Sequence, residues 1–129
     1  MSTSEAVTRD IRIQVEAQYD PERSRPYQSQ WFFLYTVQIF NEGPVAVQLI
    51  SRHWVITDAT GHVEEVRGPG VVGQQPVLAP QQSFVYTSGC PLTTPFGTMH
   101  GSYQMTTAQG EKFDAKIAAF TVSEPLAMQ

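Results

Sequence analysis

The segment IRIQVEAQ, residues 11–18, alternates apolar and polar side chains along its whole length. Ile11, Ile13, Val15 and Ala17 share one parity, and the residues between them are charged or carry amides. A period of two places successive side chains on opposite faces of a β-strand, so that one face is buried and the other meets solvent. The segment therefore predicts a half-buried strand.

Two later segments extend this prediction. Residues 30–41 begin with apolar side chains at both parities, which is typical of a central strand covered on both faces near its start. Residues 45–57 are rich in β-branched and aromatic side chains, but their apolar parity changes from odd to even between Leu49 and Ile50. A β-bulge near residues 49–51 would account for this change.

Four more segments have the composition of strands, at residues 62–66, 82–88, 99–107 and 112–122. No apolar pattern with the period of a helix runs for the dozen or so residues that a helix needs, and nine prolines are spread along the chain. We therefore predict an all-β fold, an immunoglobulin-like or fibronectin type III-like β-sandwich of about seven antiparallel strands. The cysteine and tryptophan pattern of antibody domains is absent.

A chain of 129 residues is expected to form one domain. We place the sandwich at residues 8–123, with a disordered N-terminus at 1–7 and a loose C-terminal tail at 124–129.

Charge and cysteine content limit the class of protein. Eight Lys and Arg residues against twelve Asp and Glu residues give a net charge of −4, which argues against a nucleic acid partner. The single cysteine, Cys90, cannot form an internal disulfide, and neither a signal core in residues 1–10 nor a transmembrane run is visible. We expect a cytoplasmic protein with no membrane partner. We expect a monomer, or a weak homodimer in which an exposed edge strand pairs with that of a second copy.

A glycine-rich segment at residues 67–73 supplies the first candidate site. Gly68, Gly70 and Gly73 match the G-x-G-x-x-G pattern of dinucleotide-binding loops, but no helix is expected to follow them. Successive backbone N–H groups of such a turn can also form an anion-binding nest, here beside Arg67. The structural alternative is a tight connection in which the glycines adopt positive φ angles.

The histidines and the cysteine suggest no cofactor or metal site. His53 and His62 are expected about 13 Å apart along one hairpin, too far to share one metal ion. Cys90 and His100 would make a nucleophile and base only with an orienting third group, which is not evident, and we place Cys90 in a loop. We therefore predict no catalytic residue, no metal ligand and no cofactor.

Residues 49–56, LISRHWVI, place Arg, His and Trp in a strand otherwise suited to burial. Trp54 is expected in the core. Arg52 and His53 then fall on opposite faces, and either one, if exposed beside aromatic surface, suits a contact with a protein partner. The alternative is that these polar residues keep an edge strand soluble.

Four segments together resemble the ApaG family, also called CorD. They are VQLISRHWVITD at 47–58, EVRGPGVVGQQP at 65–76, FVYTSG at 84–89 and LTTPFGTMHGSYQM at 92–105. The resemblance implies a fibronectin type III-like sandwich and, through the bacterial members, an association with cobalt resistance and magnesium efflux. Similar domains inside eukaryotic F-box proteins and a polymerase-interacting protein imply protein recognition. Relatives often carry a glutamate where this chain has Gln74, which removes one acidic ligand from the loop.

Two functional hypotheses follow. The first is a non-catalytic protein-interaction module whose partner, a protein not yet identified, contacts the glycine-rich loop and the Arg52 and His53 strand. The alternative is a weak sensor of a phosphate-containing ligand or divalent cation at the same loop. An enzyme is not expected, because the residues assemble into no recognised mechanism.

Overall fold

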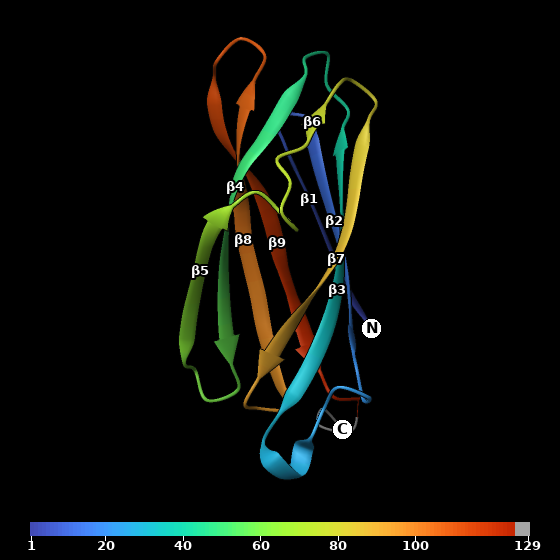
Figure 1. Ribbon diagram of the computed structural model, residues 1–129, viewed down its shortest axis with the longest axis vertical. Coiled ribbons are helices and arrows are strands. Elements are labelled where there is room, and N and C mark those ends of the chain that lie inside the picture. The colour runs from blue at the N-terminus through green and yellow to red at the C-terminus, as the bar shows by residue number, and fades with distance from the viewer. Residues whose placement is uncertain (126–129) are drawn as a thin grey trace.

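The computed structural model describes residues 1–125 and consists of two antiparallel sheets packed face to face (Figure 1). One sheet has the order β1-β2-β3-β7 and the other β5-β4-β8-β9, with β6 paired to the start of β4. The strands are β1 (Ser2–Thr8), β2 (Ile11–Tyr19), β3 (Trp31–Asn41), β4 (Val47–Asp58), β5 (Val63–Pro69), β6 (Val77–Leu78), β7 (Ser83–Leu92), β8 (Phe96–Thr107) and β9 (Lys112–Ser123). The predicted all-β sandwich is confirmed.

All seven expected strands are present, as β2, β3, β4, β5, β7, β8 and β9. One 3-10 turn, η1 (Pro26–Gln28), lies between β2 and β3. Within the part of the chain that the structure describes, no helix is long and apolar enough to cross a membrane. The odd-numbered side chains of β2 from Ile11 to Ala17 are buried, as the alternation of residues 11–18 predicts. On β3 the second apolar face is only half-buried, and the Phe32 ring covers Gly89 there.

The N-terminus differs from the prediction. Residues 2–8 are not disordered but form β1, which pairs with β2 from Ser2 opposite Ala17 to Thr8 opposite Ile11. Its alternate half-buried residues are mostly small and polar, so the segment lacks the apolar signal of a strand. The connecting turn has positive φ at both Arg9 and Asp10, a conformation usually signalled by glycine.

The predicted loose tail lies partly outside the described residues, which end at 125. Glu124 is held in place: its backbone N–H donates to Pro95 O at 2.8 Å, and Trp31 Nε1 donates to its carboxylate at 3.3 Å. Glu124 therefore packs against the end of the sandwich directly after β9.

The predicted bulge in β4 is confirmed. Leu49 faces Met105 of β8, but the next pair is Ser51 with Gln104, so Ile50 is an extra residue without an opposite. Leu49 before the bulge and Trp54 after it are both buried in the core. One extra residue reverses which parity faces inward, and this accounts for the change seen in the sequence.

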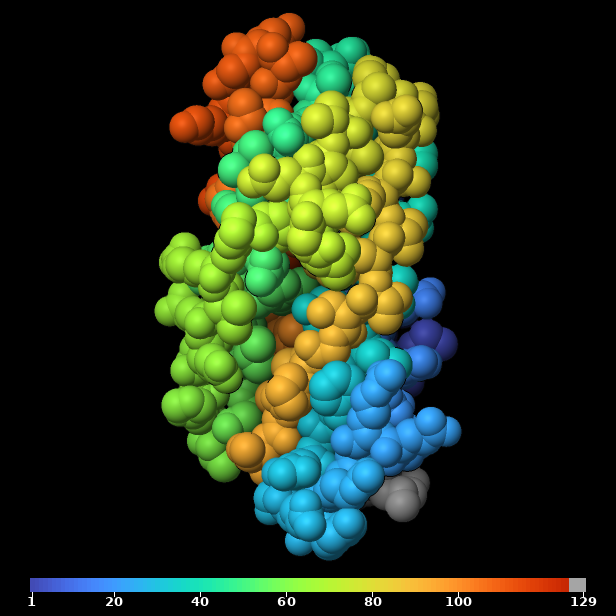
Figure 2. Space-filling model, in the orientation of Figure 1, coloured from blue at the N-terminus to red at the C-terminus, as the bar shows by residue number. Residues whose placement is uncertain are grey.

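The sandwich is closed along one side and open along the other. On the closed side β1 contacts β9, where Ser2 Oγ donates to Thr121 O and Lys116 N donates to Thr8 Oγ1. On the other side the two sheets end in β5 and β7, which are each paired on one edge only. Figure 2 shows this face, hollowed between the green atoms of β5 and the yellow-to-orange atoms of β7.

Two buried tyrosines join the sheets near this open side. The hydroxyls of Tyr86 on β7 and Tyr103 on β8 are hydrogen-bonded to each other, and both rings are buried. Burial raises the pKa of both phenols, so both remain neutral at ordinary pH and one can donate to the other. The pair satisfies two polar groups that would otherwise lie unpaired in the core.

We expect Tyr103→Phe to lower the free energy of unfolding by about 1–3 kcal/mol, because it leaves the Tyr86 hydroxyl buried without its partner. The double variant Tyr86→Phe with Tyr103→Phe should lose less than the sum of the two single losses, since it removes both polar groups together. Urea denaturation of the four proteins measures both effects. Additive losses would show that the hydroxyls do not stabilise each other.

Candidate functional site

The open side of the sandwich contains one continuous cleft, called here the β5–β7 cleft. It has two parts, with cavities of about 260 and 380 Å³, and both are lined by Tyr35, Arg52 and Ser88. The part toward the β4–β5 turn adds Trp54, Ile56, Glu64, Val66, Gly89, Cys90, Pro91 and Met99. The part under the glycine-rich loop adds Pro69, Val71, Val72, Gly73 and Tyr86.

Arg52 stands where the two parts meet. Its Nη1 donates to the backbone carbonyls of Pro69 and Gly70, both at 2.9 Å, which ties β4 to the start of the loop. Among residues 1–125 no carboxylate lies within ion-pair distance of this guanidinium. Arg52 is half-buried, so its charge is screened less than that of a freely exposed arginine. It is a cation available to an incoming acidic group.

Gly68 makes room for this arginine. It is paired with Arg52 across β4 and β5, and a Cβ at Gly68 would lie 2.9 Å from Nη2 of Arg52. The loop predicted from residue 67 therefore begins later, because β5 continues to Pro69. The glycine motif and Arg52 therefore lie side by side in the structure.

The other two glycines shape the loop itself. Gly70 has φ +60°, and a Cβ there would lie 2.2 Å from the Gln74 carbonyl oxygen. Gly73 has φ +79° in a turn closed by hydrogen bonds between Val71 and Gln74 in both directions. The positive φ angles expected for the structural alternative are thus present at Gly70 and Gly73. The N–H groups of Gly70, Val71 and Gln74 already donate to backbone carbonyls, and no helix follows the motif.

Val72 occupies a strained position at the tip of this turn. Its φ is +42°, a conformation that β-branched residues rarely adopt, and 55% of its surface is exposed. Strain of this kind is retained where the surrounding structure imposes it, often beside a functional surface. Val72 lines the cleft together with Arg52.

We expect Val72→Asn to raise the free energy of unfolding by about 1 kcal/mol, because asparagine tolerates positive φ and valine does not. The matched control is Val85→Asn on β7, which is also 55% exposed but lies in a strand. There asparagine should lower stability, since it is disfavoured in strands. Urea denaturation of both variants tests the strain, and equal effects at the two positions would rule it out.

The floor of the cleft is aromatic. Tyr35 and Trp54 are buried edge to face with ring centroids 5.2 Å apart, and Trp54 also packs against Phe120 at 5.9 Å. The indole N–H of Trp54 has no acceptor within residues 1–125. Burial raises the pKa of the Tyr35 phenol, and a hydrogen bond with Ser88 opposes this shift. The floor therefore consists of aromatic rings that carry two neutral polar groups, and the charged groups of the cleft are Arg52 and Glu64.

The outer face of the same hairpin carries the remaining candidates. His53 is paired with Arg67 across β4 and β5, and its Nε2 lies 2.7 Å from Glu65 Oε1. Arg67 is 70% exposed and lies 3.7 Å from the same carboxylate. Because Arg52 faces the cleft, the structure brings Arg52 together with Gly68, Gly70 and Gly73, and leaves His53 and Arg67 on the opposite side.

The other two histidines lie neither in the cleft nor beside His53 and Arg67. His62 and His100 are exposed, and His100 faces away from Met99, its buried neighbour on β8. Thr57 of β4 pairs with Val63 of β5, so His62 lies in the connection between the two strands. Within the described residues no three His, Cys, Asp or Glu side chains lie close enough to hold a metal ion.

Cys90 lies in β7, not in the loop predicted from the sequence. Its side chain is buried and lines the cleft beside Trp54. Burial, with a smaller contribution from the charge of Glu64, raises the pKa of the thiol to about 11. Pro91 fits the strand because β7 is an edge, where its missing N–H breaks no pairing.

We expect the Cys90 thiol to react slowly with a disulfide reagent at pH 8, because with a pKa of about 11 only about one molecule in a thousand carries the thiolate. Labelling should accelerate strongly in urea, where the chain unfolds and the pKa returns to its ordinary range. A native rate equal to that of a small free thiol would contradict the burial of this side chain.

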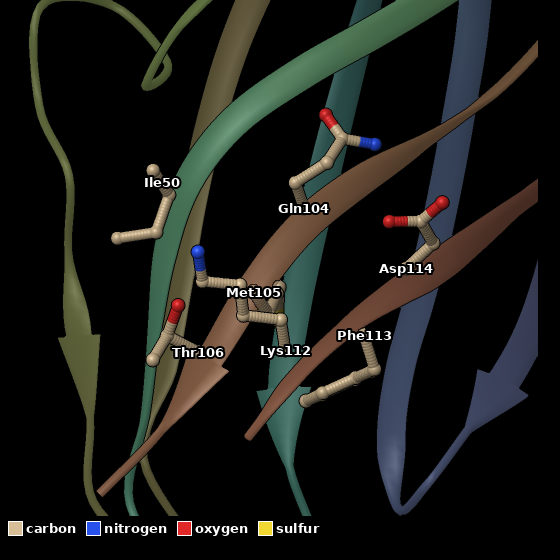
Figure 3. Close-up of a pocket in the computed structure, with 7 residues that line it drawn as sticks. All are labelled: Ile50, Gln104, Met105, Thr106, Lys112, Phe113 and Asp114. Atoms are coloured by element: carbon tan, nitrogen blue, oxygen red, sulfur yellow. The ribbon is translucent and has the colours of Figure 1, made fainter. Parts of the chain in front are cut away.

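A groove larger than either part of the cleft lies elsewhere, on the outer face of the β4-β8-β9 sheet. It measures about 590 Å³, and Figure 3 shows its lining residues spread over three neighbouring strands. Gln104 in this groove accepts from Ser51 Oγ at 2.8 Å and donates to Ser102 Oγ at 2.9 Å. These polar groups are satisfied by one another. The charged side chains of the groove, Lys112 and Asp114, are exposed, whereas Arg52 of the β5–β7 cleft is half-buried and held by two backbone carbonyls. The cleft is therefore the better candidate site.

Comparison with known proteins agrees with this fold and its motifs. The family model described as ApaG domain matches residues 21–107. A protein ApaG of Beijerinckia indica is 54% identical over 123 residues, covering 95% of both chains, and a protein ApaG of Methylorubrum populi is 57% identical over 120 residues, covering 93% of this chain and 92% of its own. A crystal structure from Bordetella pertussis, described as an ApaA protein, superposes with a TM-score of 0.88 at 51% identity, covering 93% of this chain and 98% of its own.

The fold, a sandwich closed on one side and hollowed on the other, defines a single β-sandwich domain. The chain belongs to the ApaG family.

Sequence reasoning missed part of the cleft. Tyr35, Ser88 and Glu64 were not candidates, because each lies in a segment that reads as an ordinary strand. Only the pairing of β4 with β5 and the opposing position of β7 bring them to Arg52. The one available signal was the run 49–56, where an arginine stands beside a core tryptophan.

Proposed function

We propose that this chain is a non-catalytic protein-interaction module that holds its partner at the β5–β7 cleft. The observation that carries the proposal is the half-buried guanidinium of Arg52, which is fixed by two loop carbonyls and lacks a carboxylate partner in the described chain. Arginine, tyrosine and tryptophan are enriched in binding hot spots, and Tyr35 and Trp54 form the floor of the cleft beside Arg52.

The chemistry of the cleft supports binding more than catalysis. The ApaG family is not a known class of enzyme. The Cys90 thiol has a raised pKa, and His100 is directed away from the cleft, so the two do not form a nucleophile and base. The family's association with cobalt resistance and magnesium efflux would then act through the protein partner.

A sensor of a phosphate-containing ligand or divalent cation at the glycine-rich loop is the weaker candidate. Three of the amide groups that such a nest needs are already hydrogen-bonded within the protein. An amide NMR titration with pyrophosphate, ATP, Mg²⁺ and Co²⁺ separates the two functions, because saturable shifts at Gly70 and Gly73 would favour the sensor.

We expect Arg52→Ala to weaken the partner complex about tenfold or more, because a hydrogen bond to a charged group contributes about 1.5–3 kcal/mol. Affinity capture from host extract with the wild-type chain and the variant, followed by titration of the captured partner, measures this loss. The amide spectrum of the variant establishes that it remains folded.

Arg67→Ala is the matched control. Arg67 lies one residue pair away on the same hairpin but on its outer face, so its loss should leave the complex unchanged. If the two variants lose affinity equally, or if neither loses any, the cleft is not the partner surface.

A further inference from the structure

The two edges of the β5–β7 cleft have unused backbone groups. β5 pairs only with β4, and β7 only with β3, so the outward edge of each strand has no strand partner within residues 1–125. An extended chain that lies along such an edge can form main-chain hydrogen bonds with it, a recurring mode of peptide recognition. The cleft is bounded by two such edges, which favours an elongated occupant over a compact one.

The cleft carries opposite charges toward its two ends. Arg52 is paired with Gly68, and Glu64 is paired with Ile56, four residues further along β4. Four residues of strand span about 13 Å. Glu64 also lines the cleft, and within the described residues it has no basic group at ion-pair distance. The cleft therefore has an unpaired positive charge toward one end and an unpaired negative charge toward the other.

The surface between these charges is apolar. Trp54 and Val66 form a cross-strand pair midway between them, and both line the cleft. An extended peptide places the side chains of residues i, i+2 and i+4 on one face, spanning about 13 Å. This length matches the separation of the two charged pairs, with one peptide side chain over Trp54 and Val66.

We infer that the cleft binds an extended peptide segment of a protein partner in which an acidic residue and a basic residue lie four positions apart with an apolar residue midway. The acidic side chain pairs with Arg52 and the basic one with Glu64. This inference rests on the proposed function and adds the chemistry of the segment that is recognised. β5 and β7 run in opposite directions along the cleft, so the segment is tested in both orders of charge.

The experiment uses the full chain and fluorescent peptides with Asp, Val and Lys at alternate positions, in both orders, with threonine between them. Fluorescence anisotropy should show saturable binding of at least one order. Peptides with Asp replaced by Asn should bind about tenfold more weakly or worse, and peptides with Lys replaced by Gln about threefold more weakly, because Glu64 is more exposed than Arg52.

A charge reversal provides the decisive comparison. Glu64→Lys changes an exposed side chain, so the fold should be retained, and this variant should prefer a peptide with acidic residues at both ends over the original one. Glu65→Lys is the matched control, since Glu65 is the next residue on the opposite face and should leave the preference unchanged.

The outcomes distinguish this inference from the proposed function. If a captured protein partner depends on Arg52 but Glu64→Lys does not change the peptide preference, the charge pattern is wrong and the interaction module stands. If neither peptide order binds the wild-type chain, the extended-peptide inference is overturned. If no Arg52-dependent partner exists either, the proposed function fails with it.

Discussion

The extra residue in β4 is the constraint on which the rest of the structure depends. Ile50 has no paired residue on β8, so the inward-facing residues of β4 change from odd-numbered to even-numbered at this point. Arg52 and Trp54 therefore face the space between the sheets. Without the bulge they would face outward, and Ser51 and His53 would face the core. The carbonyl of Ile50 is also free to accept from Gly70 N at 2.8 Å and from Gln75 Nε2 at 2.9 Å. The same irregularity thus places the aromatic floor and anchors the loop that covers one end of the cleft.

The glycine motif has a structural explanation in this arrangement. Gly68 leaves space for the Arg52 guanidinium, Gly70 allows the chain to pass close to the Gln74 carbonyl, and Gly73 occupies a turn position with positive φ. These are three separate steric requirements, and their spacing coincides with a pattern that in other folds precedes a helix. The rigid loop that results holds two carbonyls toward Arg52, so the motif serves to orient an arginine.

Alternation and turn chemistry were sufficient to predict most of the sheet, since six of the seven expected strands contribute buried residues at alternate positions to a common core. In β5 only Val66 and Gly68 are half-buried. β1 was missed because small side chains packed against β9 carry no apolar signal, and its recruitment depends on backbone pairing with β2. The bulge was predictable because it shifts a parity that the sequence itself displays. The cleft was not, because it depends on which side of the sandwich stays open, and that follows from contacts between residues more than a hundred positions apart, such as Thr8 with Lys116.

The open side exposes two edge strands that could pair with another copy of the chain, and each strand limits this self-association in a different way. An unpaired edge can join another copy of the chain, and charged side chains or proline on the edge reduce this tendency. β5 carries Glu64, Glu65 and Arg67, and β7 carries Pro91. Edge-to-edge pairing of two copies along β5 would bring these charged side chains into the contact and desolvate them, which disfavours it. The proposed peptide segment would offset the same cost, because its charges are complementary to those of Arg52 and Glu64.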